Sequence, residues 1–374
     1  MQKQISLEIE GQELVPPQGN TGAQSTGQRI LIDWFAFTLP SGADIFQVLG
    51  VPADEWTSID TRALGYSRMY MHGAMRVYMT EREDMGVHCE LSGAACREYE
   101  FWFGNNWSEL ITRIRSVNGT FSRIDIAIDD FDGIFTLDQI EYKVKNGQTA
   151  SYFRRGRILE EFNLSEKDNL GKTIYFGSSQ SRIKIRMYNK AIEHLLKEQQ
   201  SRETEALEQE SRHKVPGNIR KENKRNREEI YRQERLNFVQ VWNRTEIQAR
   251  DERAEVIADY IQGKMPVGEI AFGVLKHYIN FLEPSTTDSN KSRWPVSEFW
   301  TKFLGIVEEL KLTIEKQKKT LKQVREWIVR QVAPSLALLS MDKNLKLDLE
   351  KICEIAIFAK NRLTKRHLAL LQAS

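Results

Sequence analysis

The chain has few residues of the kinds that build zinc or redox sites. Of its 374 residues, 3 are cysteine and 6 are histidine. The cysteines, Cys89, Cys96 and Cys353, form no Cys-x-x-Cys pair, and no His-x-x-x-His pattern lies near them. This composition argues against a structural zinc site and a disulfide framework, and it favours a reducing compartment.

Long apolar runs and the signatures of several common enzyme classes are also missing. No apolar run reaches the length of a membrane helix and the polar start lacks a signal-peptide core, so we expect a cytoplasmic protein with no membrane partner. Gly171-Lys172-Thr173 imitates the end of a phosphate loop, but Glu166 stands where the first glycine is needed. Neither Gly-x-Ser-x-Gly nor His-Glu-x-x-His occurs. A nucleotide hydrolase, an esterase and a zinc protease are therefore disfavoured.

The net charge is small, but it is unevenly distributed. The formal charge of +2 does not by itself indicate a polyanion partner. Residues 301–374, however, hold 15 Lys and Arg against 8 Asp and Glu. We predict a DNA-binding surface at the densest basic cluster, although a solvated helix face is the commoner explanation of such a cluster. The cluster comprises Lys316, Lys318, Lys319, Lys322 and Arg325.

The pattern of apolar residues divides the chain into three regions. Residues 1–28 have the Pro-rich and Gly-rich composition of a flexible arm. Residues 29–265 mix strand and helix patterns without regular βαβ spacing, which predicts an α+β domain with a mainly antiparallel sheet and packed helices. Beyond residue 265 the strand signals vanish, so we predict that residues 266–374 form an all-helical C-terminal region for DNA binding and dimerisation.

Within the α+β domain, the individual elements can be placed approximately. We predict strands at 30–39, 69–79, 86–91, 124–128, 172–177, 182–188 and 239–250. We predict helices at 107–114, with Ser108 as N-cap, at 137–145 and at 251–260. The charged insertion at 191–236 reads as a solvated helical hairpin broken at Pro216-Gly217, or alternatively as an insertion that faces DNA.

Three segments could carry chemistry: Ser122–Asp130, Ile185–Lys190 and Arg244–Arg250. In a strand, Asp125 and Asp129 share one face but lie roughly 13 Å apart, so only one can be a first metal ligand. Glu246 is a mid-strand carboxylate, which indicates either a metal site or an Arg-Glu pair. Acids that hold a metal, cations that bind a phosphate and a tyrosine that attacks one are the groups that a DNA-nicking site requires.

These segments, in this order, resemble the replication initiation factors of rolling-circle plasmids of Gram-positive bacteria, a family that includes relaxase-like proteins of conjugative elements and some phage replication proteins. The resemblance covers residues 30–260 and extends to the helical C-terminal region, which is similar to the family's origin-recognition and dimerisation part. It is carried by Ile-Asp-Trp-Phe-Ala-Phe-Thr from Ile32, Glu-Leu-Ser-Gly-Ala-Ala-Cys-Arg from Glu90, Ser-Arg-Ile-Asp-Ile-Ala-Ile-Asp-Asp from Ser122, Tyr-Phe-Gly-Ser-Ser-Gln-Ser from Tyr175, Ile-Arg-Met-Tyr-Asn-Lys from Ile185 and Arg-Thr-Glu-Ile-Gln-Ala-Arg from Arg244.

The resemblance implies a tyrosine-dependent nickase. Tyr188 would cut one strand at an origin, keep the 5′ phosphate as a tyrosyl ester, leave a free 3′ hydroxyl and later rejoin strands. Arg186 and Lys190 would steady the scissile phosphate, and Lys190 would lower the pKa of the phenol. Arg244 would contact DNA. The implied partners are double-stranded and single-stranded origin DNA, a host DNA helicase and a second copy of the chain.

The resemblance also implies a divalent metal ion. Related nickases hold their ion with a His-hydrophobic-His strand, and this chain has no His-x-His sequence. Carboxylates would replace the histidines, which favours Mg²⁺ or Mn²⁺. We predict Asp125 and Glu246 as ligands, then Asp129, with Glu90 and Asp33 in reserve. A rival hypothesis is a noncatalytic sequence-specific DNA-binding protein, such as a repressor or an inactive relative.

Overall fold

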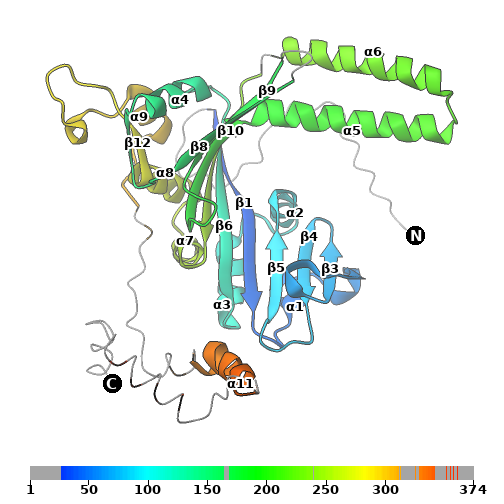
Figure 1. The fold of residues 1–374 in the computed structure, drawn as a ribbon, viewed down its shortest axis with the longest axis vertical. Coiled ribbons are helices and arrows are strands. Elements are labelled where there is room, and N and C mark those ends of the chain that lie inside the picture. The colour runs from blue at the N-terminus through cyan, green and yellow to red at the C-terminus, as the bar shows by residue number, and fades with distance from the viewer. Residues whose placement is uncertain are drawn as a thin grey trace. The chain divides into compact units, whose positions relative to one another are not determined.

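The chain divides into two compact units, Met1–Thr313 and Ile314–Ser374. The computed structural model describes residues 27–163, 168–238, 240–310 and 312, and then 325, 328–341, 351, 354, 357 and 360 (Figure 1). The predicted arm at 1–28 lies outside the described residues except for its last two. The predicted boundary at 265/266 does not coincide with the division of the chain, because helix α8 (Val267–Tyr278) packs on the sheet of the first unit.

The first unit is built on a ten-stranded sheet in which all neighbouring strands run antiparallel, as predicted. The strand order is β2-β3-β4-β5-β1-β6-β11-β10-β9-β8. The strands are β1 (Gln28–Leu39), β2 (Thr57–Asp60), β3 (Arg68–His72), β4 (Met75–Met79), β5 (Val87–Leu91), β6 (Thr120–Asp130), β8 (Gly156–Asn163), β9 (Asp168–Phe176), β10 (Ile183–Asn189) and β11 (Asn243–Arg250). A second sheet pairs β7 (Thr149–Ser151) with β12 (Ile279–Phe281).

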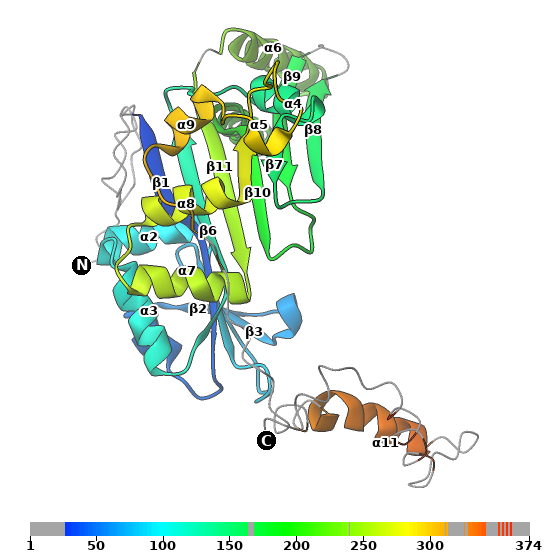
Figure 2. The ribbon, with the colours of Figure 1, turned by 90° about the vertical axis from the view of Figure 1, so that its left-hand side faces the viewer.

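Helices cover one face of this sheet, and the core lies between the two layers (Figure 2). Contacts with the sheet come from α2 (Gly93–Phe103), α4 (Leu137–Lys145), α7 (Glu252–Gln262) and α8. The alternation in β6 explains the two faces: Ile124, Ile126 and Ile128 are fully buried towards the helices, while the residues between them point the other way. The unit also contains α1 (Ile45–Leu49), α3 (Trp107–Ser116) and α9 (Glu298–Leu304), with short 3₁₀ turns at Ala53–Glu55, Ala63–Gly65 and Lys291–Arg293.

The charged insertion forms the predicted helical hairpin. Helix α5 (Lys190–Arg212) follows β10 without a loop, and α6 (Gly217–Leu236) returns beside it (Figure 1). Side chains hold the two helices together through ion pairs, among them Arg202 with Glu234 at 2.6 Å and Arg227 with Glu203 at 2.7 Å. The hairpin projects away from the sheet, and only its base contacts strands, namely β9 and β11.

Several local predictions were wrong. Residues 69–79 form a hairpin of two strands rather than one strand, because Gly73 adopts φ +55° and turns the chain. Ser108 lies inside α3, where its hydroxyl donates to the carbonyl of Gln262, and the N-cap is Asn106. The strand predicted at 239–250 begins at Asn243.

Other elements were not predicted at all. They are the edge strands β2 and β8, the short strand β7, helices α1 and α2 and strand β12. Strand β12 lies within the region for which only helices were predicted, so that region is not all-helical. Its three residues complete a small sheet with β7, a pairing between distant segments that no local pattern reveals.

In the unit Ile314–Ser374, every described residue is helical. It contains a short π-helical turn (Ile328–Val332) that leads into α11 (Ala333–Met341). Arg325 of the predicted basic cluster is helical and exposed. The other four members of the cluster lie outside the described residues, so the predicted DNA-binding surface stays a prediction. Among the helices that the structure describes in both units, none is long and apolar enough to cross a membrane.

Candidate active site

The three segments singled out in the sequence become neighbouring strands. In the order β10-β11-β6, Tyr188 pairs with Arg244, and Arg244 with Asp129. Two residues before Tyr188 on β10, Arg186 pairs with Glu246, which lies two residues after Arg244 on β11. Residues directly opposite each other in an antiparallel sheet point to the same face, so these side chains share the face turned away from α7 and α8. We call this face of the sheet the polar face.

Tyr188 and Glu246 form the centre of the site. The Tyr188 hydroxyl donates to Glu246 Oε1 at 2.7 Å, and Arg186 Nη2 donates to both carboxylate oxygens at 2.8 and 2.7 Å. Tyr188 is 5% exposed and Glu246 8% exposed. Burial, and next the charge of Glu246, raise the pKa of Tyr188 well above its ordinary value. The resting phenol is therefore protonated and aimed at a carboxylate.

Lys190 does not have the predicted effect on the phenol. Its Nζ lies 5.7 Å from the centroid of the Tyr188 ring, but it donates to Glu193 at 2.8 Å. The expectation of a lowered phenol pKa is thus wrong for this arrangement, because burial and Glu246 outweigh the nearby cations. Arg186 stacks on the same ring, with its guanidinium carbon 4.3 Å from the centroid.

The direct passage from β10 into α5 fixes the position of Tyr188. The Asn189 side chain accepts from the backbone N–H of Ile192 and so caps α5 directly after the strand. The backbone N–H groups of Lys190 and Ala191 donate to the carbonyl of Trp242, which anchors the turn to the segment before β11. The tyrosine is therefore held at the end of a strand, immediately before a rigid helix.

Asp129 lies in an arginine clamp. Arg244 donates to it through Nε at 2.6 Å and Nη2 at 2.9 Å, and Arg29 through Nε at 3.0 Å and Nη2 at 2.7 Å. Burial opposes ionisation, but Arg244 and then Arg29 bring the pKa of Asp129 below its ordinary value. Arg244 is 6% exposed and also donates to Asp33 at 3.1 Å. A DNA contact by Arg244 stays a prediction, and it would require these ion pairs to open.

Asp125 is the carboxylate that the protein holds least favourably in its ionised form. It is 4% exposed and accepts from Arg123 Nε at 2.9 Å and from Gln248 Nε2 at 3.4 Å. Burial raises the pKa of Asp125 to about 6; Glu246 also raises it, while Arg123 opposes the shift. Since Gln248 is the direct partner of Asp125, Glu246 is its diagonal neighbour on the next strand.

The predicted metal ligands lie on the adjacent strands β5, β1, β6 and β11, but they do not form a closed coordination shell. Asp33 is the extra residue of a β-bulge in β1, and burial and Glu246 raise its pKa although Arg244 opposes this. Within the described ranges, no three His, Cys, Asp or Glu side chains lie close enough together to hold an ion. Glu90 lies on β5, beyond β1, and accepts from the Tyr78 hydroxyl at 3.3 Å.

Sequence reasoning placed Asp125 and Asp129 on one face of their strand and offered an Arg-Glu pair as the alternative for Glu246; Arg186 forms that pair between β10 and β11. Arg29 and Arg123 were not predicted as site residues, although Arg123 follows the same alternation as Asp125. Arg29 could not have been found, because its contact with Asp129 joins residues 100 positions apart. Tyr175 and Arg157 are further residues in line with Arg186 on the neighbouring strands.

Comparison with known proteins gives consistent results along the chain. A family model described as replication initiation factor matches residues 119–215 and 220–352, and one described as the N-terminal domain of rolling-circle replication initiation proteins matches residues 29–113. A Bacillus subtilis (strain 168) protein named as a DNA relaxase, NicK, is 28% identical over 327 residues, which cover 85% of this chain and 82% of that protein.

A solved structure is also similar. It is that of a rolling-circle replication initiator protein from Geobacillus stearothermophilus, with 30% sequence identity and a TM-score of 0.59. The match covers 77% of this chain and 99% of the other. The sheet and helices described above are thus shared over nearly the full length of that structure.

Proposed function

The chain belongs to the replication initiation factor family, and from this premise we propose that it cuts one strand of origin DNA by attack of Tyr188 on a backbone phosphate. The phenolic oxygen would bond to phosphorus as the bond to the 3′ oxygen breaks. The products are a 5′-phosphotyrosyl ester and a free 3′ hydroxyl, and rejoining is the reverse transfer. The observation that carries the proposal is the Tyr188 hydroxyl, held 2.7 Å from Glu246 among cations.

In this proposal Glu246 accepts the phenol proton. A general base must lie within hydrogen-bond reach of the proton that it removes, and Glu246 Oε1 satisfies this condition. Arg186 is paired with the same carboxylate. The proton is needed later, since the departing 3′ oxygen must take one up to become a hydroxyl. Glu246 is suited to return it because the same carboxylate faces the reacting centre.

Arg186 and Lys190 would bind the scissile phosphate by exchanging partners. Their side chains are 36% and 16% exposed, and each is now paired with a single carboxylate, Glu246 and Glu193 respectively. A phosphate seated over the Tyr188 ring would offer both cations an anionic oxygen. As Arg186 moves from Glu246 to the phosphate, it would leave that carboxylate free to take the phenol proton, so phosphate binding and activation of the phenol would be coupled.

We also propose a requirement for Mg²⁺ or Mn²⁺. The donors fit a hard cation by their chemistry, because Asp125, Glu246 and Asp33 offer only oxygen atoms, and Glu246 is near enough to each aspartate to raise its pKa. Among the described residues no three such side chains are close enough as they stand to share an ion, so binding would need them to draw together. Asp129 is the least available candidate, since both its oxygens accept from arginines. When bound, the ion would neutralise charge on the phosphate. Binding it requires Arg123 and Arg186 to release their carboxylates.

The test is covalent capture of DNA. The protein is incubated with Mg²⁺ or Mn²⁺ and labelled single-stranded oligonucleotides that tile the DNA around the encoding gene, and the products are separated on a denaturing gel. We expect a slow-migrating protein-DNA adduct that is absent with Tyr188→Phe. Duplex binding without any adduct across the tiled region would refute the nicking proposal.

The burial of Tyr188 and the pairing of every predicted metal ligand favour one alternative, a noncatalytic DNA-binding protein. Under this alternative Tyr188→Phe would leave DNA binding unchanged and no adduct would form with any oligonucleotide. For the nickase we further propose origin DNA in both double-stranded and single-stranded form, a host helicase and a second copy of the chain as partners, with cytoplasmic action.

A further inference from the structure

The cations in and beside the candidate active site include two groups. In the first group, Arg29, Arg123, Arg186 and Arg244 are each paired with a carboxylate. The second group comprises Arg154, Arg155 and Arg157, in the loop after β7 and the start of β8. All three are exposed, and within the described part of the chain none of them is paired with a carboxylate. Unpaired exposed cations are available to an external anion.

Arg157 of the second group is aligned with the candidate active site, and Arg154 and Arg155 precede it in the loop. Arg157 pairs with Tyr175 of β9, Tyr175 with Arg186 of β10, and Arg186 with Glu246 of β11. One row of side chains therefore crosses four adjacent strands on the polar face. At about 4.8 Å per strand, Arg157 lies roughly 10 Å from Arg186, within the reach of a few nucleotides.

The residues between these positions suit a polynucleotide. Lys184 lies with its Nζ 4.7 Å from the centroid of the Tyr175 ring, so that a cation and an aromatic face stand together on the path. Burial lowers the pKa of Lys184, the charges of Arg186, Arg250 and Arg123 lower it further, and the charge of Asp125 opposes them. Cations therefore outweigh the carboxylate around Lys184.

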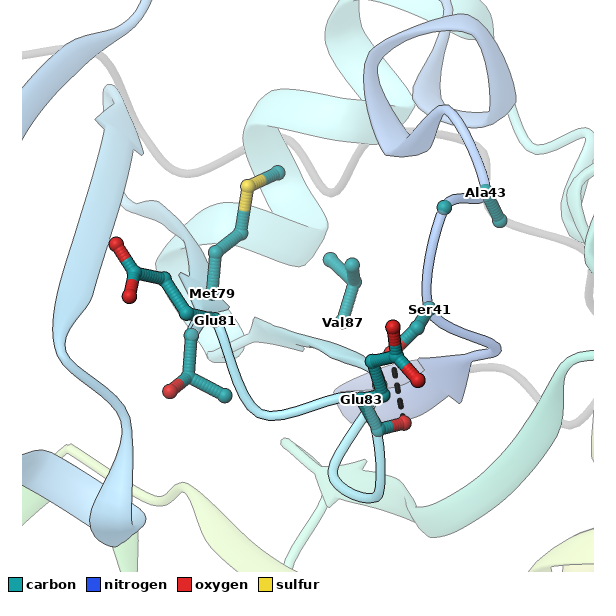
Figure 3. Close-up of a pocket in the computed structure, with 9 residues that line it drawn as sticks. Ser41, Ala43, Met79, Glu81, Glu83 and Val87 are labelled. Atoms are coloured by element: carbon teal, nitrogen blue, oxygen red, sulfur yellow. Dashed lines mark hydrogen bonds between the residues drawn. The ribbon is translucent and has the colours of Figure 1, made fainter.

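The cavity at the β8 edge is also lined by cations. It has a volume of about 420 Å³, and its lining includes Phe153 and all three unpaired arginines but no carboxylate side chain. A cavity of about 670 Å³ by the loops after β1 and β4 is the opposite: its lining contains Glu81 and Glu83 and no Lys or Arg, and the Ser41 hydroxyl donates to the Glu83 carbonyl at 2.8 Å (Figure 3). Charge therefore favours the β8 edge for a polyanion.

We infer that Arg154, Arg155 and Arg157 bind the phosphates of the single strand that flanks the reacting phosphate, so that the strand runs from Tyr188 across β9 to the β8 edge. The inference rests on the proposed function for its ligand and adds a binding site outside the reacting centre. The contribution of these three arginines to DNA binding is independent of the nucleotide sequence, because phosphate contacts carry no base information.

The test compares two triple variants with the wild-type full-length chain. The first is Arg154→Gln, Arg155→Gln and Arg157→Gln. The matched control is Lys214→Gln, Lys221→Gln and Arg225→Gln, which removes the same charge from exposed positions on the hairpin. Binding of a fluorescent 20-nucleotide oligothymidylate is measured by anisotropy as salt is raised, and circular dichroism verifies the folding of each variant.

Each phosphate contact with a single strand contributes about 0.7 to the slope of log affinity against log salt. Loss of three contacts should reduce the slope by about 2, so that between about 50 and 200 mM salt the wild type loses affinity about 20-fold more than the β8 variant. The hairpin control should keep the wild-type slope.

An unchanged slope in the β8 variant would refute the inference and leave these arginines to another partner, such as an acidic protein segment. An equal reduction in both variants would also refute it, since net charge alone would then explain the result. Adduct formation with Tyr188 is scored separately on an origin oligonucleotide. Absence of the adduct refutes nicking without affecting the binding result.

Discussion

Ionisation of Asp125 should make the free energy of unfolding fall as pH rises. Its folded-state pKa of about 6 lies above the ordinary value of 3.8, because the side chain is buried and Glu246 is close. The stabilisation associated with the protonated form is therefore fully present below the ordinary pKa and is lost as pH rises through 6. A difference of two pKa units corresponds to ~3 kcal/mol in total.

The variant Asp125→Asn cannot ionise, so it avoids this loss. Between about pH 4 and about pH 8, its free energy of unfolding should gain ~2–3 kcal/mol relative to the wild type. Urea unfolding of metal-free protein, followed by tryptophan fluorescence, measures the difference at each pH. The change with pH is compared rather than the absolute value, because Asn also loses the ion pair with Arg123. The reasoning would be refuted if the difference in free energy of unfolding between the variant and the wild type stayed constant as pH rises, or if it changed in favour of the wild type.

Asp129 provides a matched control on the same strand. Its pKa is lowered despite burial, because Arg244 and Arg29 bind the ionised form, so its stabilisation is present above the ordinary pKa and is lost on acidification. Asp129→Asn should destabilise the protein at neutral pH by ~3–5 kcal/mol, as expected when one partner of a buried ion pair is removed. The two aspartates should thus respond to pH with opposite signs. Excess Mg²⁺ should reduce the effect at Asp125 if that carboxylate holds the ion.

Three further predictions concern the site and the core. Tyr188→Phe should abolish the covalent adduct while reducing stability by only ~1 kcal/mol, the contribution of one hydrogen bond; a melting curve checks the second part, and unfolding would show that the residue is structural. Glu246→Gln should retain oligothymidylate binding but slow adduct formation by about 100-fold, measured in single-turnover assays; an unchanged rate would remove Glu246 as the base. Trp300→Ala should lower the free energy of unfolding by ~3–5 kcal/mol, measured in urea, because Trp300 is fully buried against Phe281 and Phe303. Trp300 lies outside the domain predicted at 29–265, and a small effect would show that α9 is not part of the core.

The sequence was most informative where a local pattern has one structural solution. The alternation in 122–130 correctly separated the buried isoleucines from the polar residues of β6, and the charge pattern with Pro216-Gly217 correctly predicted the hairpin of α5 and α6. Helix α4 has the predicted bounds because Thr136 caps it and its apolar residues repeat with helical spacing. Short edge strands such as β2 and β8 escaped prediction, since their pairing partners rather than their own residues define them.

The amino-acid sequence by itself determined the family, the antiparallel α+β character of the sheet and the alternation within β6 that puts Asp125 on the face opposite the isoleucines. These follow from residue order and from the two-residue period of a strand, which are local properties. Only the tertiary structure brought Tyr188, Glu246 and Asp125 onto one polar face and decided which cation pairs with which carboxylate: Arg244 with Asp129, Arg186 with Glu246 and, among the residues that the structure describes, no carboxylate with Arg157. Such pairing depends on strand order and register, and these are fixed by the burial of the whole sheet against its helices rather than by any one segment.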